Sequence, residues 1–174
     1  MNIVVFRLGH RPFRDKRITT HVFLAARAFG ASGGLYSGDK DFELEERIGK
    51  VADNFGGSFS LSYEKGWKGV VEKWKKTGRV VHLTMYGVPF EDVMSEITTD
   101  NLLIVVGGEK VPSELYKDAD YNVSVTNQPH SEVSALGVFL HSLVRGGKVK
   151  PNFQNSKFKI IPNPSGKSMK EMNI

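Results

Sequence analysis

The chain of 174 residues carries a formal net charge of +5 and is long enough for one well-buried domain, but short for two. Its hydrophobic content of 40% and charged content of 25% are typical of a globular protein. No apolar run approaches the roughly 20 residues that span a bilayer, so we expect no membrane partner. The absence of cysteine excludes disulfides and thiolate metal sites.

The same sequence bears on localisation and metal binding. Arg7 interrupts the only early apolar run, which argues against a signal peptide, and a chain without cysteine fits a reducing interior. We therefore expect a cytoplasmic protein. The five histidines do not cluster at ligand spacing, so we predict no metal.

The first expected elements are a strand at residues 3–8, a basic loop, and a helix that starts near Thr19 and stops at Gly30. One face of this helix carries Ile18, Val22, Ala25 and Phe29 at helical spacing. The other side carries Arg17, Thr20, His21 and Leu24.

Positive charge gathers at the two ends of the chain. Residues 1–30 hold six basic residues against one acidic residue, residues 145–174 hold seven against one, and the middle is acidic. The N-terminal group includes five arginines, whose guanidinium groups match phosphate oxygens with two parallel donors. This pattern favours a phosphate-binding surface, which both basic ends would form if they meet in space. The alternative is a solvated surface that is merely rich in arginine.

Strands and helices alternate through the rest of the chain. Strands are expected at residues 31–36, 58–62, 79–84, 101–106 and 121–125, and a last short strand at 157–161. Helices are expected at residues 41–54, 64–77 and 90–96, beyond Pro112, and after the capping residue Ser131. The helix at residues 41–54 would bury Phe42, Leu44, Ile48, Val51 and Phe55. The alternation predicts one α/β domain with a mainly parallel sheet and helices on both faces.

Three loops lie where such a sheet binds ligands, beyond the carboxyl ends of its strands: after Leu83, after Val106 and after Val125. The second loop begins with Gly107 and Gly108, which allow a ligand to approach the backbone closely. The P-loop, the G-x-G-x-x-G fingerprint and the G-x-S-x-G elbow do not occur in the sequence. Three common α/β enzyme classes are therefore disfavoured.

The motifs RLGHRPFRDKRITTH, ARAFGA, VVGGEKVP and TNQPHSEVSALGVFL resemble the archaeal tRNA cytidine 2′-O-methyltransferases of the SPOUT superfamily, which modify the T-loop cytidine at tRNA position 56. The resemblance covers nearly all of residues 3–145 in order. It implies a SPOUT-type trefoil knot in a single domain, S-adenosyl-L-methionine as cofactor, tRNA as partner and a homodimer. Residues 1–147 would form the methyltransferase domain, and residues 148–174 a basic extension with a short strand or hairpin.

The resemblance also implies which residues bind the cofactor. Leu83 matches the residue that lies against the adenosyl group, and two further motifs match the loops after Val106 and Val125. Those two motifs contain Gly107, Gly108, Glu109, Lys110 and Val111, and then Val125, Thr126, Asn127, Gln128, Pro129, His130, Ser131 and Glu132.

The catalytic assignment stays open, because related ribose methyltransferases place an arginine six residues before the end of the motif at Gly30, where this chain has Leu24. Arg7, Arg11 or Arg17 would take over its role. RNA binding is expected from Arg11, Arg14, Arg17 and His21. His21 is a candidate auxiliary base, although a lone helical histidine is more often structural.

Two other functions are compatible with the same residues. One is a methyltransferase that acts on a base or on another RNA site. The other is a non-catalytic RNA-binding module in which the glycine loops are purely structural.

Overall fold

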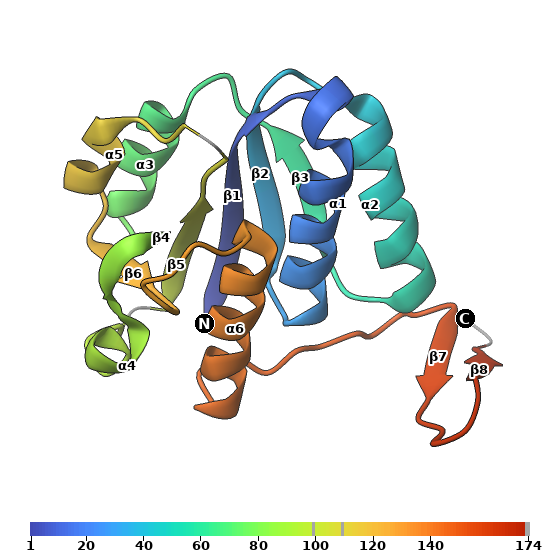
Figure 1. Cartoon of the computed structure of the whole chain (residues 1–174). Helices are drawn as coiled ribbons and strands as arrows, with labels where there is room; N and C mark the ends of the chain where they lie inside the picture. Colours follow the sequence, from blue (N-terminus) through green and yellow to red (C-terminus); the bar gives the residue numbers. More distant parts are fainter. Residues whose placement is uncertain (99, 109, 173–174) are drawn as a thin grey trace.

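Six parallel strands form one sheet, in the order β3-β2-β1-β5-β4-β6 (Figure 1). The structure is a computed structural model, and it describes residues 1–98, 100–108 and 110–172. The strands of the sheet are β1 (Asn2–His10), β2 (Gly33–Gly38), β3 (Ser60–Tyr63), β4 (Arg79–Pro89), β5 (Asn101–Val106) and β6 (Tyr121–Ser124). The helices are α1 (Pro12–Ala28), α2 (Phe42–Phe55), α3 (Trp67–Lys75), α4 (Phe90–Val93), α5 (Ser113–Asp118) and α6 (Glu132–Arg145).

Helices cover both faces of the sheet, which confirms the α/β class expected from the sequence. Helices α1, α2 and α6 pack on one face, and α3 and α5 lie on the other (Figure 1). Side chains of a strand alternate between these two layers, as Val5 and Phe6 of β1 illustrate by joining different core clusters. Trp67 and Trp74 of α3 pack against the second cluster, so they belong to the core, as their helical spacing indicates.

Strand β4 extends beyond the end that the sequence predicts. Its pairing with β6 shifts between Leu83 and Val88, so the expected loop at residues 85–89 is an irregular continuation of the strand. The side-chain amide of Asn127 donates to the carbonyl oxygens of Met85 (2.8 Å) and Gly87 (3.0 Å). The segment after β6 is thereby fixed to the end of β4.

Helix α1 begins at Pro12, and not near Thr19, so the expected basic loop is wrong: those residues form the first turns of the helix. Proline is well suited to the first helical position, because it has no N–H to leave unpaired and its φ is already helical. The buried side also differs from the expectation. It carries Asp15, Thr19, Thr20, Val22, Phe23, Ala26 and Arg27, whereas Ile18 and Ala25 are only half-buried. The helix contacts both α2 and α6, so more than one stripe of its surface is covered.

Phe42 was expected in the core and is instead 68% exposed. Asp41 caps α2 by accepting a hydrogen bond from the Leu44 N–H (3.0 Å), which makes Phe42 the first helical residue. The buried side of α2 then runs through Leu44, Ile48 and Ala52.

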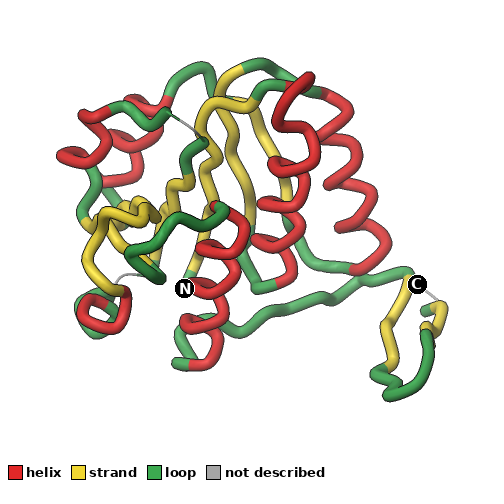
Figure 2. The backbone as a smooth tube through the Cα atoms, in the orientation of Figure 1, coloured by secondary structure: helices red, strands yellow, loops and turns green. Residues whose placement is uncertain are grey.

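The C-terminal segment packs beside the carboxyl ends of α1 and α2. The Arg27 guanidinium lies 5.1 Å from the centre of the Phe153 ring, and the Gly57 N–H donates to the Gln154 carbonyl (3.0 Å). Beyond these contacts, β7 (Phe158–Ile161) and β8 (Ser168–Glu171) form an antiparallel hairpin. Figures 1 and 2 show this hairpin at the edge of the molecule opposite to the carboxyl ends of the strands. Within one chain, the two basic ends therefore meet at Arg27 and Gly30, whereas the hairpin lies away from the basic residues at the start of α1 (Figure 1).

None of the helices in residues 1–98, 100–108 and 110–172 combines the length and apolar character that crossing a bilayer requires.

The close approach of α1 to β2 depends on Gly34. A Cβ atom at this position would lie 2.6 Å from Cδ1 of Phe23 and 3.0 Å from Cδ1 of Leu61. We expect Gly34→Ala to lower the free energy of unfolding by about 1–3 kcal/mol, measured by urea denaturation, because the methyl group overpacks this layer.

Gly49→Ala is the matched control, because a Cβ atom at Gly49, inside α2, meets nothing within 4 Å. It should raise the free energy of unfolding by roughly 0.5–1 kcal/mol through helix propensity. A Gly34→Ala variant as stable as the unaltered protein would contradict the tight α1–β2 contact.

Candidate functional site

Two pockets open beyond the carboxyl ends of the central strands. The inner pocket has a volume of about 250 Å³ and is lined by His82, Leu83, Thr84, Met85, Tyr86, Val106, Gly107, Gly108, Val111, Tyr116, His130, Glu132 and Ala135. The basic pocket has a volume of about 480 Å³ and is lined by Leu8, Gly9, His10, Arg11, Arg14, Gly38, Asp39, Gly108 and Lys110. Gly108 lines both, so the two pockets are neighbours that share a wall.

The inner pocket combines an apolar wall with a glycine backbone and a few polar atoms. Leu83 and Val106 come from the ends of neighbouring strands, β4 and β5. At Gly107, a Cβ atom would lie 2.1 Å from Cγ2 of Val111, so any larger residue would displace the Val111 side chain that lines the pocket. The Nε2 atom of His130 is buried and has no hydrogen-bond partner within the described part of the chain.

His82 contributes a neutral ring to the inner pocket. Its Nδ1 lies 2.9 Å from Oδ1 of Asn122, whose amide nitrogen donates to the Tyr116 carbonyl (2.7 Å). Since that second bond identifies Oδ1 as the acceptor, Nδ1 of His82 carries the proton and Nε2 is an acceptor. Burial lowers the pKa of His82 below its ordinary value, and the Asn122 bond opposes this only in part, so the ring stays uncharged at neutral pH.

Arg7 lies behind the shared wall, at the end of β1. Its side chain is 1% exposed, and its Nη2 forms an ion pair with Oε1 of Glu132 at 3.0 Å. A second guanidinium nitrogen donates to the Leu8 carbonyl, and a Cβ atom on Gly108 would lie 3.0 Å from Nη1. Burial lowers the pKa of Arg7 and the charge of Glu132 raises it, but a guanidinium remains charged at any physiological pH. Arg7 therefore connects β1, the glycine loop and the first turn of α6.

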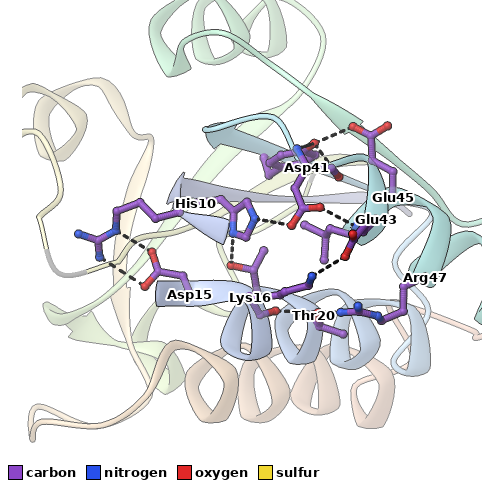
Figure 3. Close-up of polar contacts among 12 residues, drawn as sticks. His10, Asp15, Lys16, Thr20, Asp41, Glu43, Glu45 and Arg47 are labelled. Atoms are coloured by element: carbon purple, nitrogen blue, oxygen red, sulfur yellow. Dashed lines mark hydrogen bonds and ion pairs between the residues drawn. The ribbon is translucent and has the colours of Figure 1, made fainter. Parts of the chain in front are cut away.

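The basic pocket contains the cations Arg11, Arg14 and Lys110. Arg11 is the residue before the first turn of α1, and its Nε donates to Oδ2 of Asp15 at 2.9 Å (Figure 3). The same interaction lowers the pKa of Asp15, which keeps this largely buried carboxylate ionised. The Arg11 side chain is 45% exposed, so Asp15 orients a guanidinium that still faces solvent.

His10, which lines the basic pocket, joins the middle of α1 to the beginning of α2. Its Nδ1 lies 2.9 Å from Oγ1 of Thr19 and its Nε2 lies 3.2 Å from Oδ2 of Asp41 (Figure 3). Burial raises the pKa of Asp41, but the Leu44 N–H and the His10 ring outweigh it and hold this pKa below its ordinary value. The charged cap of α2 is thus tied to the residue that precedes Arg11.

The predicted site residues divide between the two pockets. Leu83, Gly107, Gly108, Val111, His130 and Glu132 line the inner pocket, whereas Lys110 joins Arg11 and Arg14 in the basic pocket. Arg17 and His21 are exposed on α1 and line neither pocket. Glu109 lies outside the described residues.

The segment after β6 stands partly apart from the pockets. Val125 packs against the core, and Thr126, Asn127, Gln128 and Pro129 are exposed without lining the inner pocket. Ser131 caps α6 by accepting a hydrogen bond from the Ser134 N–H at 3.2 Å, as its position before the apolar stripe indicates.

Several lining residues escaped the sequence reasoning. Thr84, Met85 and Tyr86 follow Leu83 directly, so they could have been predicted from the position of the strand end. No sequence signal identified His10, His82 and Tyr116 as lining residues, because their partners lie far away in the sequence. In residues 1–98, 100–108 and 110–172, no three histidine, aspartate or glutamate side chains gather in a way that would hold a metal ion.

Known proteins resemble this chain in both sequence and fold. The family model described as "tRNA ribose 2′-O-methyltransferase, aTrm56" matches residues 55–170. A tRNA (cytidine(56)-2′-O)-methyltransferase from Methanothermobacter thermautotrophicus is 51% identical, over 99% of this chain and 98% of its own. A relative of the same name from Thermococcus kodakarensis is 48% identical, over 98% and 97%.

Solved structures confirm the fold class. The SpoU methyltransferase AviRb from Streptomyces viridochromogenes, in complex with AdoMet, superposes with a TM-score of 0.62 at 16% identity. The match covers 84% of this chain and 57% of AviRb. Likeness at such low identity shows the fold alone, which is the mainly parallel α/β sheet that the sequence predicts.

The family itself is shown by sequence, since its model matches more than half of the chain and nearly full-length relatives share about half of its residues. The chain belongs to the tRNA ribose 2′-O-methyltransferase family, aTrm56.

Proposed function

We propose that the protein transfers the methyl group of S-adenosyl-L-methionine to the 2′-oxygen of the T-loop cytidine at position 56 of tRNA. The family and the names of its relatives support this activity. The observation that carries it is that the inner pocket and the basic pocket share Gly108. A methyl donor in the first and a polyanion in the second would meet at this wall.

The inner pocket fits an adenosyl ligand. Apolar side chains such as Leu83 and Val111 would hold the rings, while the glycine backbone at residues 107–108 leaves its amide groups accessible. The buried Nε2 of His130 and the acceptor nitrogen of His82 are polar atoms in or beside this space. When bound, the cofactor supplies a methyl group that is already activated by its sulfonium charge.

The residues of the basic pocket would position the RNA. A ribose hydroxyl is a weak nucleophile until its proton is shared or removed. A substrate phosphate beside the hydroxyl would help to polarise it, and its proton would pass to water when the oxygen is methylated. Arg11 would bind a substrate phosphate with Arg14 and Lys110 and would bring the hydroxyl into line. Of the three candidate catalytic arginines, Arg7 is buried in an ion pair and Arg17 lies outside the pocket, which favours Arg11.

Further parts of this proposal rest on the family resemblance. Residues 1–147 contain every residue that lines the two pockets and would form the methyltransferase domain, with residues 148–174 as an extension. The loops after β5 and β6 would belong to a trefoil knot. The chain would act in the cytoplasm as a homodimer. An apolar groove of about 910 Å³ between α1, α2 and the hairpin is not covered by other parts of the chain, which supports a contact with a second copy there.

Gly108→Val should weaken cofactor binding by roughly 10- to 100-fold in calorimetry, because its branched side chain would press on the Arg7 guanidinium and fill the shared wall. Circular dichroism should show an intact fold. Gly49→Ala should bind the cofactor with unchanged affinity. Unchanged cofactor affinity in folded Gly108→Val would show that the cofactor binds elsewhere.

Arg11→Ala and Arg17→Ala should each lower the slope of log affinity for tRNA against log salt by about 0.7–0.9, because each removes one phosphate contact. Arg11→Ala should also reduce turnover, and cofactor affinity should stay the same in both variants. Lys73→Ala, on the exposed side of α3, is the control and should keep the original slope. Two unchanged slopes would show that the arginines form only a solvated surface.

The product can be identified by alkaline cleavage, in which the 2′-oxygen of RNA attacks the adjacent phosphate. After incubation of an unmodified tRNA transcript with protein and cofactor, one rung of the alkaline ladder should disappear in the T-loop. A complete ladder with methyl incorporation would indicate a methylated base. RNA binding without any incorporation would indicate a non-catalytic module.

A further inference from the structure

Two phenylalanine side chains are exposed to solvent at the beginnings of α1 and α2. Phe13 is fully exposed, at 107% of its reference area, and Phe42 is 68% exposed. Each occupies the first turn of its helix, where a polar residue would have served the helix better. Exposed rings that gather in one place mark a contact surface more often than scattered single ones do.

The two rings are held on neighbouring elements. His10 links the first helix to Asp41, the cap of the second, through the bonds described above. Closer to the start of α1, Nζ of Lys16 lies 2.5 Å from Oε2 of Glu43, so α1 and α2 are also joined at their surfaces (Figure 3). Phe13 comes three residues before Lys16, and Phe42 comes directly before Glu43.

Cations follow Phe13 along α1, and one lies beside the Phe42 ring. Arg14 follows Phe13 and lines the basic pocket, and Arg17 is exposed one helical turn further along α1. Nζ of Lys40 lies 4.4 Å from the centre of the Phe42 ring, which is a cation–π distance. Charged groups that bind phosphates, placed beside flat rings on which bases stack, are the combination that single-stranded nucleic acid requires.

We infer that Phe13 and Phe42 form a stacking surface for unpaired bases of the tRNA at the entrance of the basic pocket. This inference rests on the proposed function and deepens it. A base can lie on either ring while its phosphates reach Arg14 and Arg17, because sequence-specific RNA recognition uses unstacked bases on aromatic side chains. A second copy of the chain is the less suitable occupant, since it would bring the same cations against one another.

The test compares tRNA affinities at one salt concentration. Phe13→Ala should bind unmodified tRNA about 5- to 100-fold more weakly, because it removes a stacking ring. Phe13→Trp should retain the affinity, and Phe13→Leu, which keeps the apolar bulk without the ring, should behave like Phe13→Ala. Met169→Ala, which removes a 58% exposed apolar side chain from β8 of the hairpin at the opposite edge, should bind like the unaltered protein.

Two further measurements separate stacking from a structural role. The salt slope of Phe13→Ala should equal that of the unaltered protein, because no charge is lost. Single abasic sites placed along the T-loop of a T-arm hairpin should include one that weakens binding to the unaltered protein. The same site should have no additional effect in Phe13→Ala.

Clear outcomes would overturn the inference. Unchanged tRNA affinity in folded Phe13→Ala, while Arg17→Ala still lowers the salt slope, would remove the stacking surface and leave the proposed function standing. A Phe13→Ala protein that falls to the 19.4 kDa monomer mass in light scattering, when the unaltered protein does not, would assign the ring to contacts between copies. Absence of tRNA binding by the unaltered protein would remove both proposals.

Discussion

The buried ion pair between Arg7 and Glu132 is the interaction on which the arrangement of the site depends. It joins the end of a central strand to the first turn of α6, and the guanidinium also supports Gly108 from behind. Arg7 is almost inaccessible to water, whereas the Glu132 side chain is 23% exposed, so loss of Glu132 would leave the charge of Arg7 uncompensated at a cost of about 3–5 kcal/mol. The position of Glu132 at a helix N-terminus adds a favourable interaction with the helix dipole. A single buried cation thus holds the wall between the two pockets.

A second set of contacts makes the basic pocket rigid. His10 is buried between Thr19 and the charged cap of α2, and Asp15 holds the neighbouring Arg11. Gly38 completes this arrangement at a φ of +104°, since a Cβ atom there would lie 2.3 Å from the His10 carbonyl oxygen. Guanidinium groups that are oriented before the substrate arrives lose less freedom when they bind it. The first turns of α1 and α2 therefore act as one preformed surface.

The sequence predicted the parts of the molecule that depend on local pattern. Strand β5 begins and ends where its continuous aliphatic run does, and Ser131 caps its helix as expected. The errors arose where contacts with distant parts of the chain determine the start of a helix or the burial of a side chain. The start of α1 was missed because its first turns are polar, and Phe42 was assigned to the core because its spacing fits an apolar stripe. The partners of His10 and Arg7 lie far along the chain, and no local pattern reveals such pairs. The loops after β4, β5 and β6 were predicted to bind the cofactor because strand ends mark them and a family resemblance names them, and this assignment stays a prediction.

With the cofactor in the inner pocket and RNA in the basic pocket, as proposed, the shared wall at Gly108 would link the two ligands thermodynamically. A cofactor that prefers one position of this loop changes the free energy with which RNA enters the neighbouring pocket, because the same backbone lines both. Linkage is reciprocal, so RNA must alter cofactor affinity by the same factor. Replacement of the methyl donor by its demethylated product changes the charge on one side of a single glycine. Under this proposal, the wall where the two reactants would meet is also the place where the protein would respond to completion of the reaction.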